Sequence, residues 1–328
     1  MMRYQDKVKY LSIALVVLLV AFGLGEFFAP ERVSSRQEAF TALPSKSGEV
    51  AKVELLGPGA GASLTFTRGG GQWALEDASA RLPVQSNRIE AMLTALSAAG
   101  KRRPVAGNKD SWKSLGLDDA QAKVLKLTDG TGKLLLELRV GSHGPSGSEV
   151  YARFGTAEAS FMIDAAVASY LGTDRASWLD RRLFGNAPEA AAYQAFAVRA
   201  DIILNPADKA AKPLNIAWRF ERSGQLWKGG ARELDPVTIE SVLRAAGNLE
   251  ATDLAAAAPA EAFAKVSATI TLDLGSGKTR IIEIGAPAAD GRFWARATEA
   301  GQPRPFGYQV SRYSLESILK SEESFAKK

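Results

Sequence analysis

The chain has 328 residues, of which 46% are hydrophobic, and it contains one histidine and no cysteine. This composition excludes thiolate zinc sites, iron–sulfur clusters, cysteine nucleophiles and multi-histidine metal sites. The 41 Lys and Arg residues against 36 Asp and Glu residues leave a net charge of only +5, which is not the footprint of a nucleic-acid-binding protein. We therefore expect two domains that use no metal, cofactor or nucleic acid.

The first distinctive element is the uncharged apolar stretch Leu11–Gly25, which lies between Lys9 and Glu26. A helix over the 16 residues from Tyr10 to Gly25 rises roughly 24 Å, against a hydrocarbon layer of about 30 Å. Basic residues precede the stretch. The positive-inside tendency therefore predicts a single-pass anchor in a bacterial inner membrane, with the N-terminus in the cytoplasm and the bulk of the chain in the periplasm.

Two other interpretations of Leu11–Gly25 stay open. The basic start and apolar core also fit a cleaved signal peptide, with Gly23–Gly25 as a small-x-small cleavage site. A buried core helix is the third interpretation. The anchor and the signal peptide both place the rest of the chain outside the cytoplasm.

After a tether, short alternating segments predict a first folded unit. Its strands are expected over 50–56, 63–68, 72–75, 123–127, 133–140, 149–154 and 160–163. One helix interrupts them, because Ile89, Met92, Leu93 and Leu96 have the spacing of a single helix face. Asn87 is its expected N-terminal cap.

The same order of elements then begins again. Strands are expected over 196–204, 216–222, 225–227, 268–274, 279–284, 291–297 and 307–310, and a last helix near 313–318. Asp235 followed by Pro236 predicts the start of a helix whose apolar face is Ile239, Val242, Leu243 and Ala246.

Matched residues indicate that the chain contains an internal duplication. Arg68 and Arg222 are 154 positions apart, and so are Trp73 and Trp227. Ile89 and Ile239 differ by 150, Gly141 and Gly285 by 144, and Tyr151 and Trp294 by 143. The matches keep their order along the chain, which favours two tandem domains and not a solenoid.

The predicted fold class is α+β: an N-terminal transmembrane helix followed by two tandem repeats of antiparallel sheet with a packed helix. The expected parts are a cytoplasmic N-terminus 1–9, a transmembrane anchor 10–28, a tether 29–48, a first repeat 49–184 and a second repeat 185–328.

Three motifs suggest chemistry but have plainer interpretations. Gly275–Thr279 ends like a phosphate-binding loop, but Leu272 stands where that loop needs glycine, and a strand follows, so we predict a hairpin turn. His143 lies in a Gly/Ser/Pro loop, where a solvated side chain is expected. Asp118 and Asp119 could belong to a carboxylate pair of an envelope hydrolase, although an acidic start to a turn is the simpler interpretation.

The candidate residues for interaction form three groups. Trp73 and Trp227 occupy matching strand positions, where they would serve the core or, if exposed, a glycan or partner surface. The basic run Lys101, Arg102 and Arg103 could meet anionic lipid or an acidic partner, or be a solvated face. Arg181 and Arg182 lie at the junction between the repeats.

Several short motifs together resemble the bacterial domain-of-unknown-function family numbered 4340. The motifs are Gly71–Trp73, Gly116–Asp118, Val140-Gly141, Tyr151–Arg153 and Asp180–Leu183. The resemblance covers the first repeat well and the second loosely, since the Ala-rich stretch 255–264 replaces the Gly-Leu-Asp turn. It implies a membrane-anchored protein that accompanies subunits of ABC-type transporters of the gliding-motility kind, and it implies no catalytic residues.

The expected function is therefore that of a non-enzymatic, membrane-anchored accessory or scaffold protein, associated with an ABC-type transporter complex. The alternative is a cell-wall or polysaccharide-binding module that uses Trp73 and Trp227 as stacking platforms.

Overall fold

The computed structural model describes residues 47–59, 61–77, 80–98, 103–185, 188–230, 232–288 and 290–327. The described strands form two antiparallel sheets, one of nine and one of ten strands, and the three longest described helices have 13, 12 and 7 residues. The described part of the protein is therefore mainly β, and the predicted α+β class is wrong. Within the described ranges no helix is long and apolar enough to cross a membrane, and Leu11–Gly25 lies outside them.

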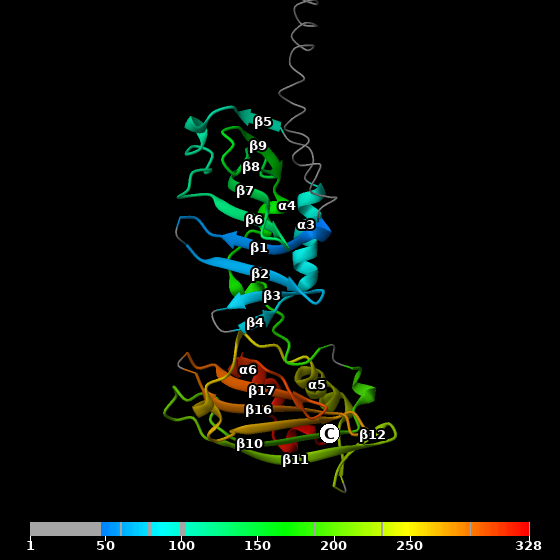
Figure 1. Cartoon of the computed structure of the whole chain (residues 1–328). Helices are drawn as coiled ribbons and strands as arrows, with labels where there is room; N and C mark the ends of the chain where they lie inside the picture. The colour runs from blue at the N-terminus through cyan, green and yellow to red at the C-terminus, as the bar shows by residue number, and fades with distance from the viewer. Residues whose placement is uncertain are drawn as a thin grey trace, which may run out of the picture. The chain divides into compact units, whose positions relative to one another are not determined.

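Among the residues that the structure describes, the first repeat runs through nine strands and two α-helices, with short 3-10 turns between them; Figure 1 labels these strands and helices. Its elements are β1 (Val50–Leu56), β2 (Ser63–Gly69), β3 (Gln72–Asp77), β4 (Ala80–Pro83), α3 (Ser86–Ala98), β5 (Arg103–Ala106), η2 (Lys109–Ser111), β6 (Lys123–Asp129), β7 (Leu134–His143), β8 (Glu149–Phe154), β9 (Ser160–Asp164) and α4 (Ala166–Ser169).

The second repeat passes through counterparts of these elements in the same sequence. They are β10 (Ala195–Ile202), β11 (Leu214–Ser223), β12 (Leu226–Gly229), β13 (Arg232–Glu233), α5 (Pro236–Gly247), β14 (Asp253–Ala255), η5 (Ala260–Phe263), β15 (Ala268–Asp273), β16 (Thr279–Pro287), β17 (Phe293–Glu299), β18 (Gln302–Pro303), β19 (Gly307–Val310) and α6 (Arg312–Ile318). The junction between the repeats carries η3 (Arg175–Ser177).

The two sheets have the same topology. The first has the strand order β4-β3-β2-β1-β6-β7-β8-β9-β5, and the second has β13-β12-β11-β10-β15-β16-β17-β19-β14, with β18 beside β17. Replacing each strand by its counterpart converts one order into the other. The duplication seen in the sequence spacing is thus also a duplication of topology.

Contacts within the chain cluster into two compact units whose boundaries differ from those of the repeats. The first unit holds the described residues up to Ser63 together with Asn87–Thr173. The second holds Leu64–Ser86 and the chain from Asp174 onward, so the strands β2, β3 and β4 belong to it.

Each unit has its own apolar core. In the first, α3 buries Ile89, Met92, Leu93 and Leu96, the face that the sequence spacing predicted. In the second, α5 buries the corresponding predicted face, and Trp218 stacks on Phe220 with ring centroids 4.3 Å apart. Asp235 caps α5 as predicted, because its carboxylate accepts the backbone N–H groups of Val237 and Thr238.

Candidate functional site

The family-like motifs of the first unit converge on one structural cluster. The Leu115 carbonyl accepts the backbone N–H of Ser142 at 3.0 Å. Gly141 lies so near to Leu115 that a Cβ at this position would overlap that carbonyl oxygen. Arg153 donates from Nε to the Leu117 carbonyl at 3.1 Å. The Gly-Leu-Asp turn, the Val-Gly pair and the Tyr-Ala-Arg strand, distant in sequence, therefore pack together.

Arg153 is the buried centre of this cluster. Its side chain also donates to the Gly155 carbonyl, it lies over Trp112 with Cζ 3.7 Å from the ring centroid, and only 3% of the residue is exposed. Burial lowers the pKa of the guanidinium, and the nearby positive charge of Arg139 acts in the same direction. Neutral carbonyls and an aromatic face thus hold this cation within the fold.

The second unit repeats the same device with different residues. Arg296, on the strand equivalent to that of Arg153, lies over Phe263 with Cζ 4.6 Å from the ring centroid. Gly285, the counterpart of Gly141, faces the Ala262 carbonyl at a distance that leaves no room for a Cβ. An arginine over an aromatic ring thus occurs in both units, with Trp112 in the first and Phe263 in the second. Its role is to pack a strand against a 3-10 loop.

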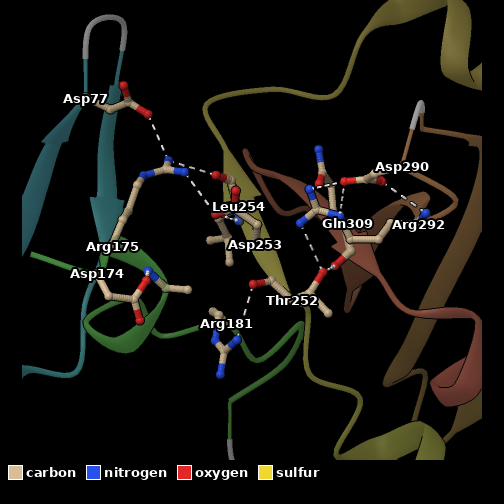
Figure 2. Close-up of polar contacts among 11 residues, drawn as sticks. Asp77, Asp174, Arg175, Arg181, Thr252, Asp253, Leu254, Asp290, Arg292 and Gln309 are labelled. Carbon is tan, nitrogen blue, oxygen red and sulfur yellow. Dashed lines mark hydrogen bonds and ion pairs between the residues drawn. The ribbon is translucent and has the colours of Figure 1, made fainter. Parts of the chain in front are cut away.

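A second polar cluster, the arginine network, lies wholly within the second unit. Figure 2 shows the Arg175 guanidinium between the end of β3 and the chain entering β14. It donates to the Asp77 carboxylate at 2.9 Å, to the Asp253 carboxylate at 2.9 Å and to the Leu254 carbonyl at 2.8 Å. Asp174 caps the 3-10 turn that carries Arg175, because its carboxylate accepts the Ala176 N–H.

Arg181 and Arg182 continue the network. Arg181 donates to the Thr252 carbonyl at 3.2 Å and pairs with Glu250 at 2.9 Å. Arg182 donates two hydrogen bonds of 2.9 Å to the Asp180 carboxylate. These bonds lower the pKa of that carboxyl below its usual range, although the burial of Asp180 acts to raise it. These residues thus join the junction segment to the chain that follows α5.

Thr252, the residue directly before β14, links the network to β19 and to the turn between β16 and β17. Its N–H and hydroxyl both donate to the Gln309 carbonyl, at 2.7 and 2.9 Å. Arg292 donates to the Thr252 hydroxyl at 3.4 Å and to Asp290 at 2.5 Å, and these bonds are drawn in Figure 2. The Arg292 hydrogen bonds lower the pKa of the Asp290 carboxyl, and the same pairing raises the pKa of Arg292.

The arginine network has the chemistry of a structural joint. Each of its arginines, Arg175, Arg181, Arg182 and Arg292, is bonded to a carboxylate or carbonyl of the same unit. The described part of the chain contains no group of three or more His, Asp or Glu side chains able to hold a metal ion. Such an arrangement orients segments of backbone, and it leaves its cations already neutralised.

Trp73 and Trp227, the two tryptophans predicted as candidate interaction residues, lie in the core. Trp73 is 3% exposed and Trp227 is 1% exposed. Each is paired across a hairpin with an arginine that lies over its ring: Arg68 has its Cζ 5.0 Å from the Trp73 centroid, and Arg222 has its Cζ 5.7 Å from the Trp227 centroid. The indole faces are therefore covered by the protein itself.

The basic run falls only partly within the described chain. Lys101 and Arg102 lie outside the described residues, and Arg103 is the first residue of β5. β5 stands at the end of the strand order and pairs with β9.

The remaining motifs have local roles. Gly275–Thr279 is the predicted hairpin turn between β15 and β16, closed by the Lys278 N–H donating to the Gly275 carbonyl at 3.0 Å. His143 was predicted in a loop, but it is the last residue of β7 and pairs with Val150 of β8; its exposed side chain has Nδ1 3.3 Å from the Gly147 carbonyl. Asp118 accepts the Gln121 N–H in a turn, and Asp119 pairs with Arg139.

Sequence reasoning assigned no role to Arg153 or Arg175. The Tyr-Ala-Arg motif contained a usable signal for Arg153, since a lone arginine in an otherwise apolar strand pattern needs a buried partner. For Arg175 the sequence offered no such signal, because its acceptors Asp77 and Asp253 lie 98 and 78 positions away.

The fold and the two polar clusters together define a duplicated, mainly antiparallel β protein. Its motif residues pack strands against loops, and its arginine network joins separate segments of the chain. The family described as "Domain of unknown function (DUF4340)" matches residues 73–265, more than half of the chain. The chain belongs to this family, as its motifs suggested. Comparison with curated proteins and with solved structures returned no match.

Proposed function

We propose that the protein is a non-enzymatic accessory or scaffold protein of the bacterial envelope, held at the membrane by the apolar segment Leu11–Gly25. Its bulk lies on the extracytoplasmic side, where it assembles with a membrane-protein complex of the ABC-transporter kind. The transporter enters the proposal through the family resemblance, and the membrane enters through the hydropathy of the N-terminal segment.

The proposal that the protein is not an enzyme rests on the arginine network, in which each arginine is already bonded to a carboxylate or carbonyl of the same unit. Arg175 donates to two carboxylates and a carbonyl of its own unit, which is the pattern of a structural cross-link between segments. The first sheet also ends in the short strand β5, a backbone edge of the type that binds extended partner segments.

The polysaccharide-binding alternative gains no support from the site. It required indole faces presented to solvent, and Trp73 and Trp227 are covered by Arg68, Arg222 and the surrounding core. We therefore propose no second function.

Mild cross-linking in intact cells, detergent extraction and capture through a C-terminal tag would test the proposal, with mass spectrometry of the captured proteins. The matched control carries residues 1–28 fused to an unrelated soluble domain. We expect transporter permease or ATPase subunits to be enriched over this control. Wall fragments, or no enrichment of any transporter subunit, would contradict the proposal.

A further inference from the structure

An aromatic residue from the junction segment closes the end of β4 in the second unit. Trp178 is fully buried, and its ring centroid lies 5.0 Å from that of Phe66 on β2. The Trp178 carbonyl accepts the Gln85 N–H at 2.9 Å, and the next residue, Leu179, forms a bridge with Val84. An extended segment with an aromatic anchor is therefore docked beside the residues that follow β4.

The same arrangement occurs after β13. Phe325 is fully buried, and its ring centroid lies 4.9 Å from that of Phe220 and 5.1 Å from that of Trp218. Its carbonyl accepts the Asp235 N–H at 2.9 Å, and the residue after it forms a bridge with Leu234. Trp218, Phe220, Leu234 and Asp235 thus form a socket for the Phe325 side chain and its backbone.

The two anchored segments show what such a socket recognises. Between the repeats the socket residues are offset by 150 to 154 positions and the anchors by 147, so the site is duplicated with the fold. The anchor is an indole in one copy and a phenyl ring in the other, and the residue after it is leucine or alanine. The socket therefore accepts an extended segment in which an aromatic side chain precedes an apolar one, and backbone pairing fixes its direction.

The segment around Trp178 is firmly fixed. Leu179 is also fully buried, and the Gln85 side chain donates to its carbonyl at 3.2 Å. The Asp180 N–H donates to the Pro83 carbonyl at 2.9 Å. The chain on both sides of this anchor belongs to the arginine network, which ties it to the rest of the unit.

Its counterpart in the second repeat, the strap Ser321–Lys327, buries much less. Among these described residues only Phe325 is buried, and Ala326 is exposed although it forms the bridge. Lys327 pairs with Glu233 at 3.5 Å, but the two side chains are 62% and 53% exposed. One aromatic side chain therefore provides most of the apolar burial that keeps the strap closed.

Release of the strap would leave α6 in place. The Lys320 carbonyl accepts the Trp218 Nε1–H at 2.9 Å, and Leu315, Ile318 and Leu319 are buried. Burial of a single phenylalanine favours the closed strap by roughly 10- to 150-fold. A segment of another protein with a comparable anchor can therefore compete for the socket.

We propose that the socket is a docking site for an extended segment of a partner protein, and that the strap occupies it until the partner displaces it. The partner segment carries an aromatic residue in the place of Phe325, then an apolar residue, then a Lys or Arg that faces Glu233. This inference deepens the proposed function and rests on it only for the existence of a protein partner.

The direct test supplies the strap to the full chain as a separate molecule. The probe is a fluorescein-labelled peptide with the sequence of residues 321–328, and fluorescence anisotropy measures its binding. We expect the Phe325→Ala chain to bind the peptide at least tenfold more tightly than the unchanged chain, because its own strap has lost its anchor. The same peptide carrying Phe325→Ala should bind neither chain. Equal affinity of the two chains, or of the two peptides, would overturn the proposal.

A matched control separates release of the strap from general loosening. Phe293→Ala removes a phenylalanine that is equally buried, in β17 of the same unit, and should leave the affinity for the peptide unchanged. If this variant gains as much affinity as Phe325→Ala, loss of stability explains the binding and the proposal is wrong.

A reversible lock tests the chain with its anchor intact. Glu233→Cys combined with Lys327→Cys places two thiols where the ion pair stands, in a chain that has no other cysteine. The oxidised chain should not bind the peptide, and reduction should restore the binding of the unlocked chain. Binding that oxidation does not change, or no binding by the reduced chain, would overturn the proposal even if Phe325→Ala fails to fold.

Capture from cells identifies the occupant. Transporter subunits should accompany the unchanged chain and be lost from the locked chain, whereas equal capture by both would remove this inference alone. Dimers of the purified chain that disappear on locking would show that the strap of a second copy is the occupant, and the partner assignment would be wrong. Absence of transporter subunits from both captures would remove the proposed function, whatever the peptide shows.

Discussion

Gly141 and Gly285 occupy the same position in two topologically identical sheets, and each faces a backbone carbonyl that leaves no room for a side chain. The carbonyl belongs to Leu115 in the first unit and to Ala262 in the second. Both carbonyls lie in the segment that follows the edge strand of their own sheet and precedes the next long strand. The duplicated fold thus keeps the close approach although the segments differ in sequence.

Replacing either glycine with alanine should destabilise the protein by about 1–3 kcal/mol, because the methyl group must displace backbone and not a flexible side chain. Chemical denaturation of Gly141→Ala and Gly285→Ala measures this. Gly107→Ala is the matched control, since a Cβ there meets nothing within 4 Å. Equal stability of all three variants would show that the close approach is absent.

Arg175→Ala should lower the free energy of unfolding by roughly 1–2 kcal/mol, a figure reduced for the partial exposure of Arg175, Asp77 and Asp253. Faster hydrogen exchange in β3 and β4 should accompany the loss. Arg219→Ala, which removes an exposed pair with Glu221, should change stability by less than about 0.5 kcal/mol. If both variants lose the same amount, Arg175 is an ordinary surface arginine.

Trp73→Ala and Trp227→Ala should each cost about 3–5 kcal/mol, because both side chains are fully enclosed. The half-buried Trp294 is the matched control, and its replacement with alanine should cost less. Chemical denaturation provides the values, and binding to isolated peptidoglycan is measured in parallel. Unchanged stability with lost binding would restore the stacking-platform interpretation.

Asp180 should make the protein acid-sensitive. Its pKa is lowered in the folded state, chiefly by hydrogen bonds from Arg182, so its contribution is present above the unfolded pKa of about 4 and is lost as pH falls through the folded value. Asp180→Asn should therefore flatten the stability profile below about pH 4. Thermal melts from pH 2 to 7 measure the profile, with Asp110→Asn as an exposed control. An unchanged slope would contradict the pairing.

Local sequence patterns predicted most of the longer elements. β1 (Val50–Leu56), β8 (Glu149–Phe154) and β19 (Gly307–Val310) have the predicted bounds, and α5 begins at its predicted cap. Alternation and the helical period are properties of a single segment, which is why they can be read without the fold. The cap predicted at Asn87 was wrong, since α3 begins at Ser86.

The short strands were missed, and with them the fold class. β4, β5, β13, β14 and β18 have two to four residues each, too few for a visible period. They exist because a neighbouring strand supplies hydrogen-bond partners, which is information held by another part of the chain. Without them the single helix of each repeat appeared more prominent than it is, and the α+β prediction followed.

The sequence alone determined that the chain has two related halves, where their long strands and main helices lie, and which family it belongs to. It did so because internal matches, periodicity and short motifs are carried by residues close in sequence. Only the tertiary structure decided that Trp73 and Trp227 are enclosed, that Arg153 centres the motif cluster, and that Arg175 joins Asp77 to Asp253. Burial and pairing over such separations depend on how the chain folds back on itself, and no local pattern records that.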